Sequence, residues 1–234
     1  GGGISGLVAA WRLRDEHEVT LFEANDYLGG HTNTVSVDEC DADDRRLSID
    51  TGFIVFNDWT YPNFIALLDE LGVASQPTEM SFSVRDDAAK LEYNGHSLAT
   101  LFAQRTNIAR PRFLRMLADI VRFNRQAPRL LENVSDDLTV GEFLERYRYS
   151  RAFREWYLLP MGSAIWSCPR IAFEQFPIRF IVEFYRNHGL LNLRQRPTWR
   201  VVREGSQTYV RAMAAQLGDR IRLASPVTGV RRLP

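Results

Sequence analysis

This 234-residue sequence has almost no lysine and no formal net charge. Lys90 is the single lysine among 29 basic residues, and these balance 29 acidic residues to a formal net charge of +0. A chain without net positive charge has no general electrostatic attraction for nucleic acid or an anionic membrane surface, although a local patch leaves peripheral membrane contact open. Because the other basic residues are arginines, contacts to anions would be made by planar, permanently charged guanidinium groups.

Cysteines and long apolar runs are also scarce. Cys40 and Cys168 are the two cysteines, and their spacing fits neither a C-x-x-C redox pair nor a zinc site. We therefore expect no metal site and a reducing, cytoplasmic location. The most apolar stretch, 156–168, contains Pro160 and Gly162 and is shorter than the roughly 18 residues of a transmembrane helix. The remaining composition, 45% hydrophobic and 25% charged, is that of an ordinary globular protein.

The chain opens on a glycine-rich turn that leads into a helix-forming segment. Gly1, Gly3 and Gly6 form a G-x-G-x-x-G pattern. In a dinucleotide-binding unit the first glycine permits a tight turn, the second lets pyrophosphate approach the backbone, and the third lets the helix pack closely. The helix N-terminus, with Ile4 and Ser5, offers free N–H groups to phosphate. Such a turn follows a central strand, and because no residues precede Gly1 we expect a fragment whose first strand is missing.

A carboxylate follows the glycines at the spacing that ribose recognition needs. Residues 19–23 are β-branched and apolar and predict a strand that ends in Glu23, 17 residues after Gly6 (23 − 6). An acidic residue roughly 20 positions after the last glycine accepts a hydrogen bond from a ribose 2′-hydroxyl and disfavours a 2′-phosphate. A surface glutamate that closes a strand is the simpler interpretation of Glu23 alone, but strand, spacing and turn together favour a nucleotide.

The segment after this strand resembles a known family. Residues 23–34, EANDYLGGHTNT, are similar to the E-A-x-x-x-x-G-G-R-x-x-T motif of the flavin-containing amine oxidase and phytoene desaturase superfamily. Asn25 and His31 stand where that superfamily usually has arginines, so pyrophosphate binding would depend on backbone N–H groups and the helix dipole. The resemblance implies an FAD cofactor along Glu23, Ala24, Gly29, Gly30, His31 and Thr32.

Two further segments extend the resemblance. Residues 50–57, DTGFIVFN, resemble the superfamily's Asp–Gly motif beside the flavin, although the pattern alone indicates a strand entered through a turn. Strands at 199–202, 220–223 and 227–230 and a helix at 209–217 resemble the closing part of the nucleotide fold. These segments imply cofactor contacts at Asp50, Thr51, Gly52 and Phe53, and through the backbone of Val227.

The superfamily's C-terminal glycine–aspartate motif, which completes the flavin site, has no counterpart before Pro234. This is a second reason to expect a piece of a longer protein. We expect that this piece binds FAD poorly by itself.

The middle of the chain has a different pattern. Alternating residues at 80–84 and 90–93, with Asn94-Gly95 as a turn signal, predict strands, and Pro111 opens an amphipathic helix that ends near Glu132. Thr139 and Glu142 have the spacing of a capping box and predict the start of a further helix. The fold class we expect is α/β: a Rossmann-like FAD-binding domain without its first strand, with an inserted α+β substrate domain. The FAD domain would comprise residues 1–74 and 198–234, and the substrate domain residues 75–197.

An aromatic series in the middle region allows two interpretations. Four phenylalanines recur at helical spacing around Pro177 and predict one helix face, at Phe173, Phe176, Phe180 and Phe184. This face would line a tunnel for a long-chain substrate or, as we favour, form a core stripe. For His188 a structural role in a helix-ending turn is likewise favoured over a place in a flavin pocket.

The resemblance implies an FAD-dependent oxidoreductase that removes a hydride from a C–N or C–C bond of a small or lipid-like substrate. A narrower resemblance, through 61–64, 158–167 and 187–191, is to bacterial NAD/FAD-binding oxidoreductases associated with cyclopropane-fatty-acid synthase, which suggests a lipid acyl substrate. Two alternatives stay open: an NAD-dependent dehydrogenase that uses residues 1–23 alone, and a non-catalytic module that keeps the fold. The pattern specifies no catalytic residue, electron acceptor or oligomeric state.

Overall fold

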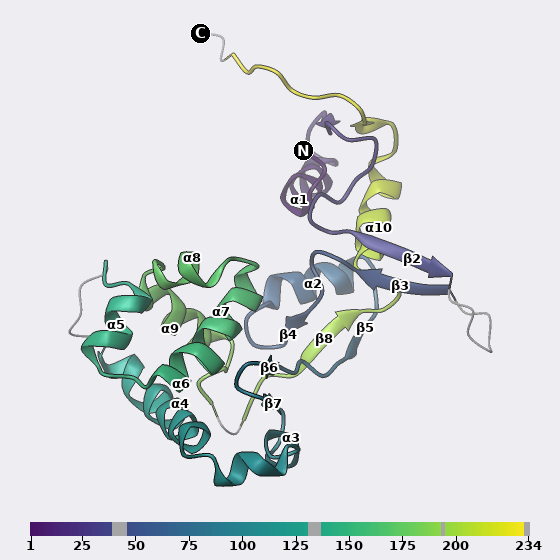
Figure 1. Cartoon of the computed structure of the whole chain (residues 1–234). Helices are drawn as coiled ribbons and strands as arrows, with labels where there is room; N and C mark the ends of the chain where they lie inside the picture. Colours follow the sequence, from purple (N-terminus) through teal and green to yellow (C-terminus); the bar gives the residue numbers. More distant parts are fainter. Residues whose placement is uncertain (39–45, 131–136, 193–194, 232–234) are drawn as a thin grey trace. The chain divides into compact units, whose positions relative to one another are not determined.

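The computed structural model of the chain describes residues 1–38, 46–130, 137–192 and 195–231, and Cys40 lies outside these ranges. The chain divides into two compact units (Figure 1). Unit 1 comprises Gly1–Glu79 with Thr198–Pro234, and unit 2 comprises Met80–Pro197. The first boundary lies after Glu79 and not after residue 74 because strand β5 pairs with strand β8 of unit 1.

Unit 1 combines short strands with three described α-helices. In chain order its elements are α1 (Ile4–Leu13), β1 (Leu21–Phe22), β2 (Thr34–Asp38), β3 (Arg46–Asp50), β4 (Phe56–Asn57), α2 (Pro62–Glu70), β5 (Ser75–Pro77), β8 (Trp199–Val202), α10 (Gln207–Leu217), the 3-10 turn η4 (Gly218–Arg220) and β9 (Ile221–Arg222).

The strands of unit 1 join segments that are far apart in the sequence. β1 and β9 pair in parallel, with Leu21 opposite Ile221. β4, β8 and β5 form an antiparallel sheet in that order, and β2 and β3 form a separate antiparallel hairpin. The strand predicted at 19–23 is shorter than expected, and the one predicted at 227–230 is absent, because the described residues after β9 form no strand.

The core of unit 1 forms where α1 lies beside α10 (Figure 1). α1 buries Leu7, Ala10 and Trp11, which have the i, i+3, i+4 spacing of one helix face. α10 buries Val210 and Met213 in the same hydrophobic cluster. This packing fixes the helix whose N-terminal end carries the glycine-rich turn.

Unit 2 is mostly helical. Its elements are β6 (Ser83–Asp86), β7 (Leu91–Asn94), α3 (Leu98–Leu101), the 3-10 helix η1 (Arg105–Ala109), α4 (Pro111–Leu130), α5 (Val140–Arg146), α6 (Arg151–Phe153), the π-helical segment η3 (Arg154–Leu158), α7 (Leu159–Trp166), α8 (Arg170–Glu174) and α9 (Ile178–Asn187).

Two helix starts in unit 2 follow the sequence prediction. α4 begins at Pro111, where the fixed φ of proline suits the first turn. At the start of α5, the Thr139 hydroxyl accepts a hydrogen bond from the Glu142 N–H (3.2 Å), and the Glu142 carboxylate accepts one from the Thr139 N–H (3.0 Å). This capping box satisfies N–H groups that the helix leaves free.

The turn signal at Asn94-Gly95 does not join two strands. The chain between β6 and β7 turns earlier, where Asp86 accepts a hydrogen bond from the N–H of Ala89 (2.9 Å) and Lys90 has φ +49°. Asn94 ends β7, and its side chain accepts a hydrogen bond from the N–H of His96 (2.7 Å). β6 and β7 can be joined without a glycine because the Asp86 side chain stabilises the turn between them.

The four phenylalanines do not lie on one helix face, and that prediction is wrong. Pro177 disfavours helical geometry at the residue before it, so the helix breaks between α8 and α9. The four rings nevertheless meet, because the centroid of the Trp166 ring lies 4.8–6.0 Å from those of Phe173, Phe176, Phe180 and Phe184.

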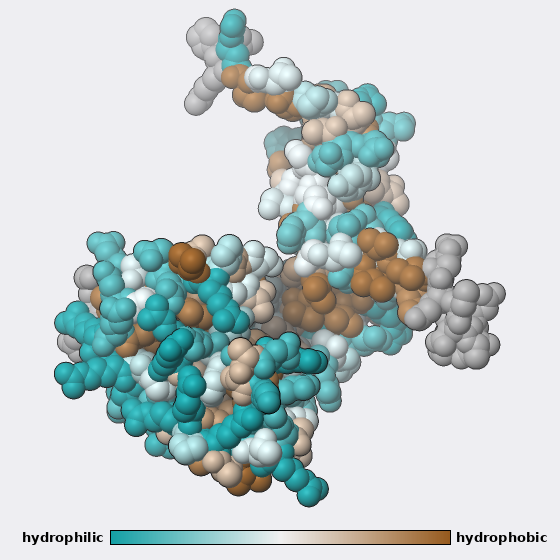
Figure 2. All heavy atoms as spheres, in the orientation of Figure 1, coloured by the Kyte–Doolittle hydropathy of each residue, from teal (hydrophilic) through white to brown (hydrophobic). Residues whose placement is uncertain are grey.

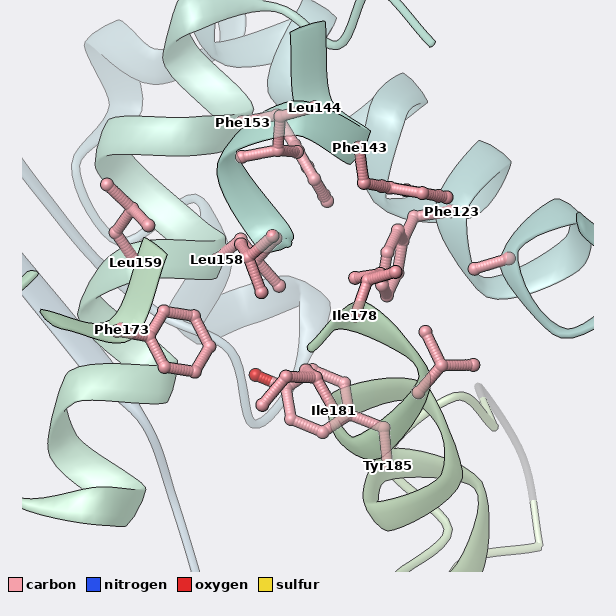
Figure 3. Packing of buried hydrophobic residues seen from close by; sticks show 13 residues of the cluster. Phe123, Phe143, Leu144, Phe153, Leu158, Leu159, Phe173, Ile178, Ile181 and Tyr185 are labelled. Atoms are coloured by element: carbon pink, nitrogen blue, oxygen red, sulfur yellow. The ribbon is translucent and has the colours of Figure 1, made fainter. Parts of the chain in front are cut away.

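The centre of unit 2 is an aromatic and aliphatic core (Figure 3). Phe123, Phe143 and Phe153 meet there with Ile178 and Tyr185 from α9. Phe173 belongs to this core and Phe176 and Phe184 pack against it, which agrees with the preference for a core role, whereas Phe180 is 48% exposed. Within the described ranges, no helix has both the length and the apolar character needed to cross a bilayer.

Candidate functional site

A pocket of about 410 Å³ lies over the glycine-rich turn of unit 1. Two short segments separated by β1 come together around it. The lining residues are Gly1, Gly3, Ile4, Ser5, Gly6, Gly29, His31 and Thr32. Each of these eight was a candidate from the sequence, so the structure brings half of the predicted site residues together in one place.

The glycines of the first segment have different roles. A Cβ atom on Gly6 would lie 2.0 Å from the carbonyl oxygen of Gly1, so a side chain does not fit there. A Cβ atom on Gly3 would have none of the described heavy atoms within 4 Å, and its φ of −72° and ψ of 174° suit any residue. Gly3 therefore borders open space, which is the room that a pyrophosphate close to the backbone requires.

The N-terminal end of α1 is suited to binding an anion. Gly3 is the N-cap residue and has no side chain to occupy the first N–H groups, and the first turn holds no acidic residue. These N–H groups and the positive end of the helix dipole favour a negatively charged group. His31 lines the same pocket from the second segment.

Glu23 is buried at the end of β1, with 8% of its surface exposed. Its carboxylate accepts hydrogen bonds from the N–H groups of Asn25 (2.9 Å) and Gly2. These two bonds, that of Asn25 first, hold the pKa of Glu23 below its ordinary value. An ionised carboxylate thus lies beside Gly1, whereas Ala24 is exposed, and neither residue is among those that line the pocket.

The second glycine pair lies directly against the first turn. Gly29 and Gly30 have φ values of +121° and +56°, which favour glycine. The N–H of Gly29 donates to the carbonyl oxygen of Gly2 (2.9 Å), and a Cβ on Gly30 would lie 3.1 Å from the Cα of Gly3. The two motifs are therefore parts of one cradle.

Helix α10 holds the second segment in place. The Thr32 and Tyr209 hydroxyl groups form a buried hydrogen bond of 2.6 Å, and the Gln207 side-chain amide donates to the carbonyl oxygen of Leu28 (3.1 Å). The sequence did not identify Tyr209 or Gln207. The only available signal was the predicted helix itself, because a contact between residues 177 positions apart leaves no local pattern.

Asp50 anchors the β2–β3 hairpin to the same helix. Its carboxylate accepts hydrogen bonds from the N–H (2.9 Å) and hydroxyl (2.7 Å) of Ser206 and from the hydroxyl of Thr34 (2.5 Å). The Thr34 oxygen in turn accepts a hydrogen bond from the N–H of Gln207 (2.9 Å). Asp50 thus caps the start of α10 and is not among the residues that line the described pocket.

The three residues after Asp50 contact the segment that carries His31. Thr51 donates its N–H to the carbonyl oxygen of Asn33 (2.9 Å), and Phe53 donates its own to that of His31 (3.2 Å). A Cβ on Gly52 would lie 1.9 Å from the His31 carbonyl oxygen. The ring of Phe53 packs edge-on against Phe64 at 5.2 Å, in the core. Thr51, Gly52 and Phe53 hold the segment of His31 without being part of the pocket lining.

Val227 is not brought to the pocket. The chain after β9 turns at Ala224, which has φ +49° and donates its N–H to the carbonyl oxygen of Asn25 (2.8 Å). The N–H of Ser225 donates to the carbonyl oxygen of Glu23 (2.8 Å). The described residues beyond Ser225 have no strand partner. Val227 is 61% exposed in this stretch.

Two other expectations concern His188 and metal binding. His188 follows α9, its Nδ1 lies 2.9 Å from the carbonyl oxygen of Phe184, and its ring stacks on that residue at 3.9 Å, which supports the structural role. Among the residues that the structure describes, no three His, Cys, Asp or Glu side chains gather to hold a metal ion.

Comparison with known proteins gives one family match. The model of the flavin containing amine oxidoreductase family matches residues 4–234. A protein of Mycobacterium tuberculosis named "Putative flavin-containing monoamine oxidase AofH" is 28% identical over 250 residues, covering 99% of this chain and 50% of that protein. The chain therefore spans about half the length of the curated relatives it matches.

Solved structures of two amine oxidases share the fold. A triple mutant of putrescine oxidase redesigned in its cofactor binding has a TM-score of 0.61 and 22% identity, covering 97% of this chain and 50% of that chain. Cyclohexylamine oxidase from Brevibacterium oxydans has a TM-score of 0.60 and 21% identity, with the same coverage. The expected α/β, Rossmann-like fold is thereby confirmed.

Proposed function

This chain belongs to the flavin-containing amine oxidoreductase family, and we propose that it contributes the FAD-binding cradle of an oxidoreductase that oxidises the C–N bond of a small amine. The observation that carries the proposal is that both glycine segments line one pocket, with the buried Glu23 carboxylate beside Gly1. The amine is favoured because the relatives with recorded substrates in their names are amine oxidases.

Three parts of the cradle would hold FAD. The open space at Gly3 and the N–H groups of the first turn of α1 suit the pyrophosphate. The Glu23 carboxylate suits the ribose hydroxyl groups, which donate hydrogen bonds. His31 and Thr32 close over the linker from the second segment. Since Asn25 and His31 replace the usual arginines, backbone groups carry most of this binding.

When bound, FAD supplies an acceptor for a hydride taken from the substrate. The residues of this chain have a positioning task, because Tyr209, Gln207 and Asp50 fix the segments that surround the cofactor. We propose that unit 2 serves as the substrate domain, and that the two units correspond to the FAD and substrate domains expected from the sequence.

A visible spectrum of the full-length protein tests the cofactor. The expected result is a yellow protein, or a colourless one that gains protein-bound flavin bands on addition of FAD. Anaerobic addition of putrescine or cyclohexylamine as probes should then bleach those bands. A protein that never acquires flavin bands contradicts the cofactor, whereas a flavoprotein that bleaches with neither amine nor any other amine contradicts the substrate class.

The same assay separates the alternatives. An NAD-dependent dehydrogenase would show no flavin bands and would instead produce NADH absorbance, and the contact between the two glycine pairs would then be incidental. A lipid acyl substrate, suggested by the association with cyclopropane-fatty-acid synthase relatives, would bleach the flavin in place of the amines. A non-catalytic module would bind FAD, but its photoreduced flavin would not react with any acceptor.

We also propose a reducing, cytoplasmic location, as the cysteine spacing indicates. Cys168 is a free thiol in the described part of the chain. Fractionation of cells that express the full-length protein tests this, and recovery with a secreted or periplasmic fraction would contradict it.

A further inference from the structure

The β2–β3 hairpin has one aliphatic face. Because side chains alternate along a strand, Val35 and Val37 of β2 share a side with their cross-strand partners Ile49 and Leu47 of β3. These four side chains are 39–47% exposed. Figure 2 shows hydrophobic atoms gathered over this hairpin. The face is therefore a continuous patch of branched aliphatic groups and not a single exposed residue.

The opposite face of the hairpin is polar, and it is the face used within unit 1. Thr34 and Asp50 lie on it and bind the first turn of α10 through Ser206 and Gln207. Ser36 and Ser48 continue the same face and are exposed. If the hairpin packed only against its own unit, its aliphatic face would be expected to pack on the core of that unit. Here the polar face is held within the unit, and in the described part of the chain the four aliphatic side chains remain 39–47% exposed.

A hairpin in this state needs a further partner. An isolated two-stranded hairpin is marginally stable in water and gains stability by packing an apolar face. β2 and β3 pair only with each other among the described strands. Strand edges and an aliphatic patch that stay uncovered would also favour aggregation.

We propose that the aliphatic face of Val35, Val37, Leu47 and Ile49 is the docking surface for an apolar segment of the rest of the whole protein, outside the half that this chain matches. The matched relatives are about twice as long as the part aligned with this chain, so a comparable length of polypeptide is available as the occupant. A segment of the same polypeptide docks without the entropic cost of bringing two molecules together. Its surface must be uncharged, since the face offers it only branched aliphatic groups.

Docking at this face would act on the cofactor cradle. β2 begins two residues after Thr32, which lines the pocket, and β3 ends at Asp50, which anchors α10. If the hairpin is fixed, the pocket residue Thr32 before β2 and the anchor Asp50 at the end of β3 are fixed as well. The proposal does not depend on the identity of the cofactor or of the substrate, and its test uses neither.

Thiol labelling of the full-length protein tests the proposal. In a background whose native cysteines are replaced by serine, Val37→Cys and Ser36→Cys place a thiol on opposite faces of β2, and Leu47→Cys and Ser48→Cys do the same on β3. Maleimide should label the two aliphatic-face thiols at least about tenfold more slowly than their polar-face neighbours, and all four equally in denaturant. Variants are compared only when their thermal midpoints match that of the background.

Equal labelling on both faces of both strands would overturn the proposal. Slow labelling that becomes fast on dilution would also overturn it, because a second copy of the protein would then be the occupant. Slow labelling that is independent of protein concentration, together with a monomeric mass, is the result expected for a segment of the same polypeptide.

Discussion

The hydroxyl groups of Thr32 and Tyr209 lie 2.6 Å apart in a buried hydrogen bond between residues 177 positions apart in the sequence. Thr32 lines the candidate cofactor pocket, and Tyr209 belongs to α10, where its ring also packs edge-on against Phe64 at 5.3 Å. One side of the pocket is thus positioned by a residue that does not line it.

Removal of either hydroxyl is expected to weaken both the fold and the cradle. Tyr209→Phe and Thr32→Val each leave a partner unsatisfied and should each lower the free energy of unfolding of the full-length protein by about 1–3 kcal/mol. The double variant should cost less than the sum of the two. Urea unfolding and FAD titration measure the two effects. Tyr27→Phe, at an exposed position, is the control and should change stability by less than about 0.5 kcal/mol. Strict additivity would contradict the coupling.

Gly3→Ala is expected to impair cofactor binding without harming the fold. Its backbone angles suit alanine, and the added methyl group enters open space in the pocket. The thermal midpoint should stay unchanged while the dissociation constant for FAD rises at least about tenfold. Gly6→Ala is the contrast, because its methyl group would meet the Gly1 carbonyl oxygen at 2.0 Å and should lower stability itself. Unchanged FAD affinity in Gly3→Ala would show that the pyrophosphate lies elsewhere.

Glu23 should contribute a pH-dependent part of the stability. The N–H groups of Asn25 and Gly2 lower the pKa of its carboxyl below the ordinary value of 4.5. The ionised form is therefore favoured by folding, so its contribution is complete above pH 4.5 and is lost as the pH falls through the lowered pKa. Glu23→Gln should lose stability at neutral pH and lose less of it on acidification, as urea midpoints at several pH values would show.

The exposed Glu18→Gln is the matched control for that experiment and should leave the stability at neutral pH unchanged. Glu23→Gln should also weaken FAD binding by about tenfold, since an amide replaces a charged acceptor. A pH dependence identical in Glu23→Gln and the wild type would contradict the assignment.

In unit 2, Gly162→Ala is expected to disrupt the core. The added Cβ would lie 2.0 Å from the fully buried Phe173 ring, so one of the two must shift. The cost should be about 1–3 kcal/mol of stability, measured by chemical denaturation. Gly141→Ala in α5 is the control, because its Cβ would be 3.5 Å from the nearest heavy atom, an ordinary contact. That variant should be neutral or more stable by up to about 1 kcal/mol. Equal effects would contradict the packing at Phe173.

Local patterns predicted the parts of this structure whose causes are local. The capping box of Thr139 and Glu142 and the start of α4 at Pro111 depend on residues within one turn. The glycine segments were found because each carries its own backbone requirement, and their meeting in one pocket followed from the family resemblance.

The failures involve partners that are distant in sequence. Helical spacing placed four phenylalanines on one face, yet Pro177 broke the helix and Trp166 gathered the rings. The hydrogen bond between Asp50 and Ser206, 156 residues later, was not predicted from the sequence. No pattern around Val227 revealed that its strand would lack a described partner. Side-chain contacts between remote segments are decided by tertiary packing, which periodicity does not encode.

The division of unit 1 by unit 2 has a consequence for biosynthesis. The glycine-rich turn leaves the ribosome before the rest of unit 1. β1 can pair only after β9 has been made, and Thr32 can bond only after Tyr209 has been made, while unit 2 is one continuous stretch that can fold in between. Pairing of Pro77 with Arg200 then closes the loop that contains unit 2. The cradle is therefore completed only after unit 2 has been synthesised, and nascent chains stalled before residue 207 should not retain FAD, whereas chains released after residue 222 contain every described element of unit 1.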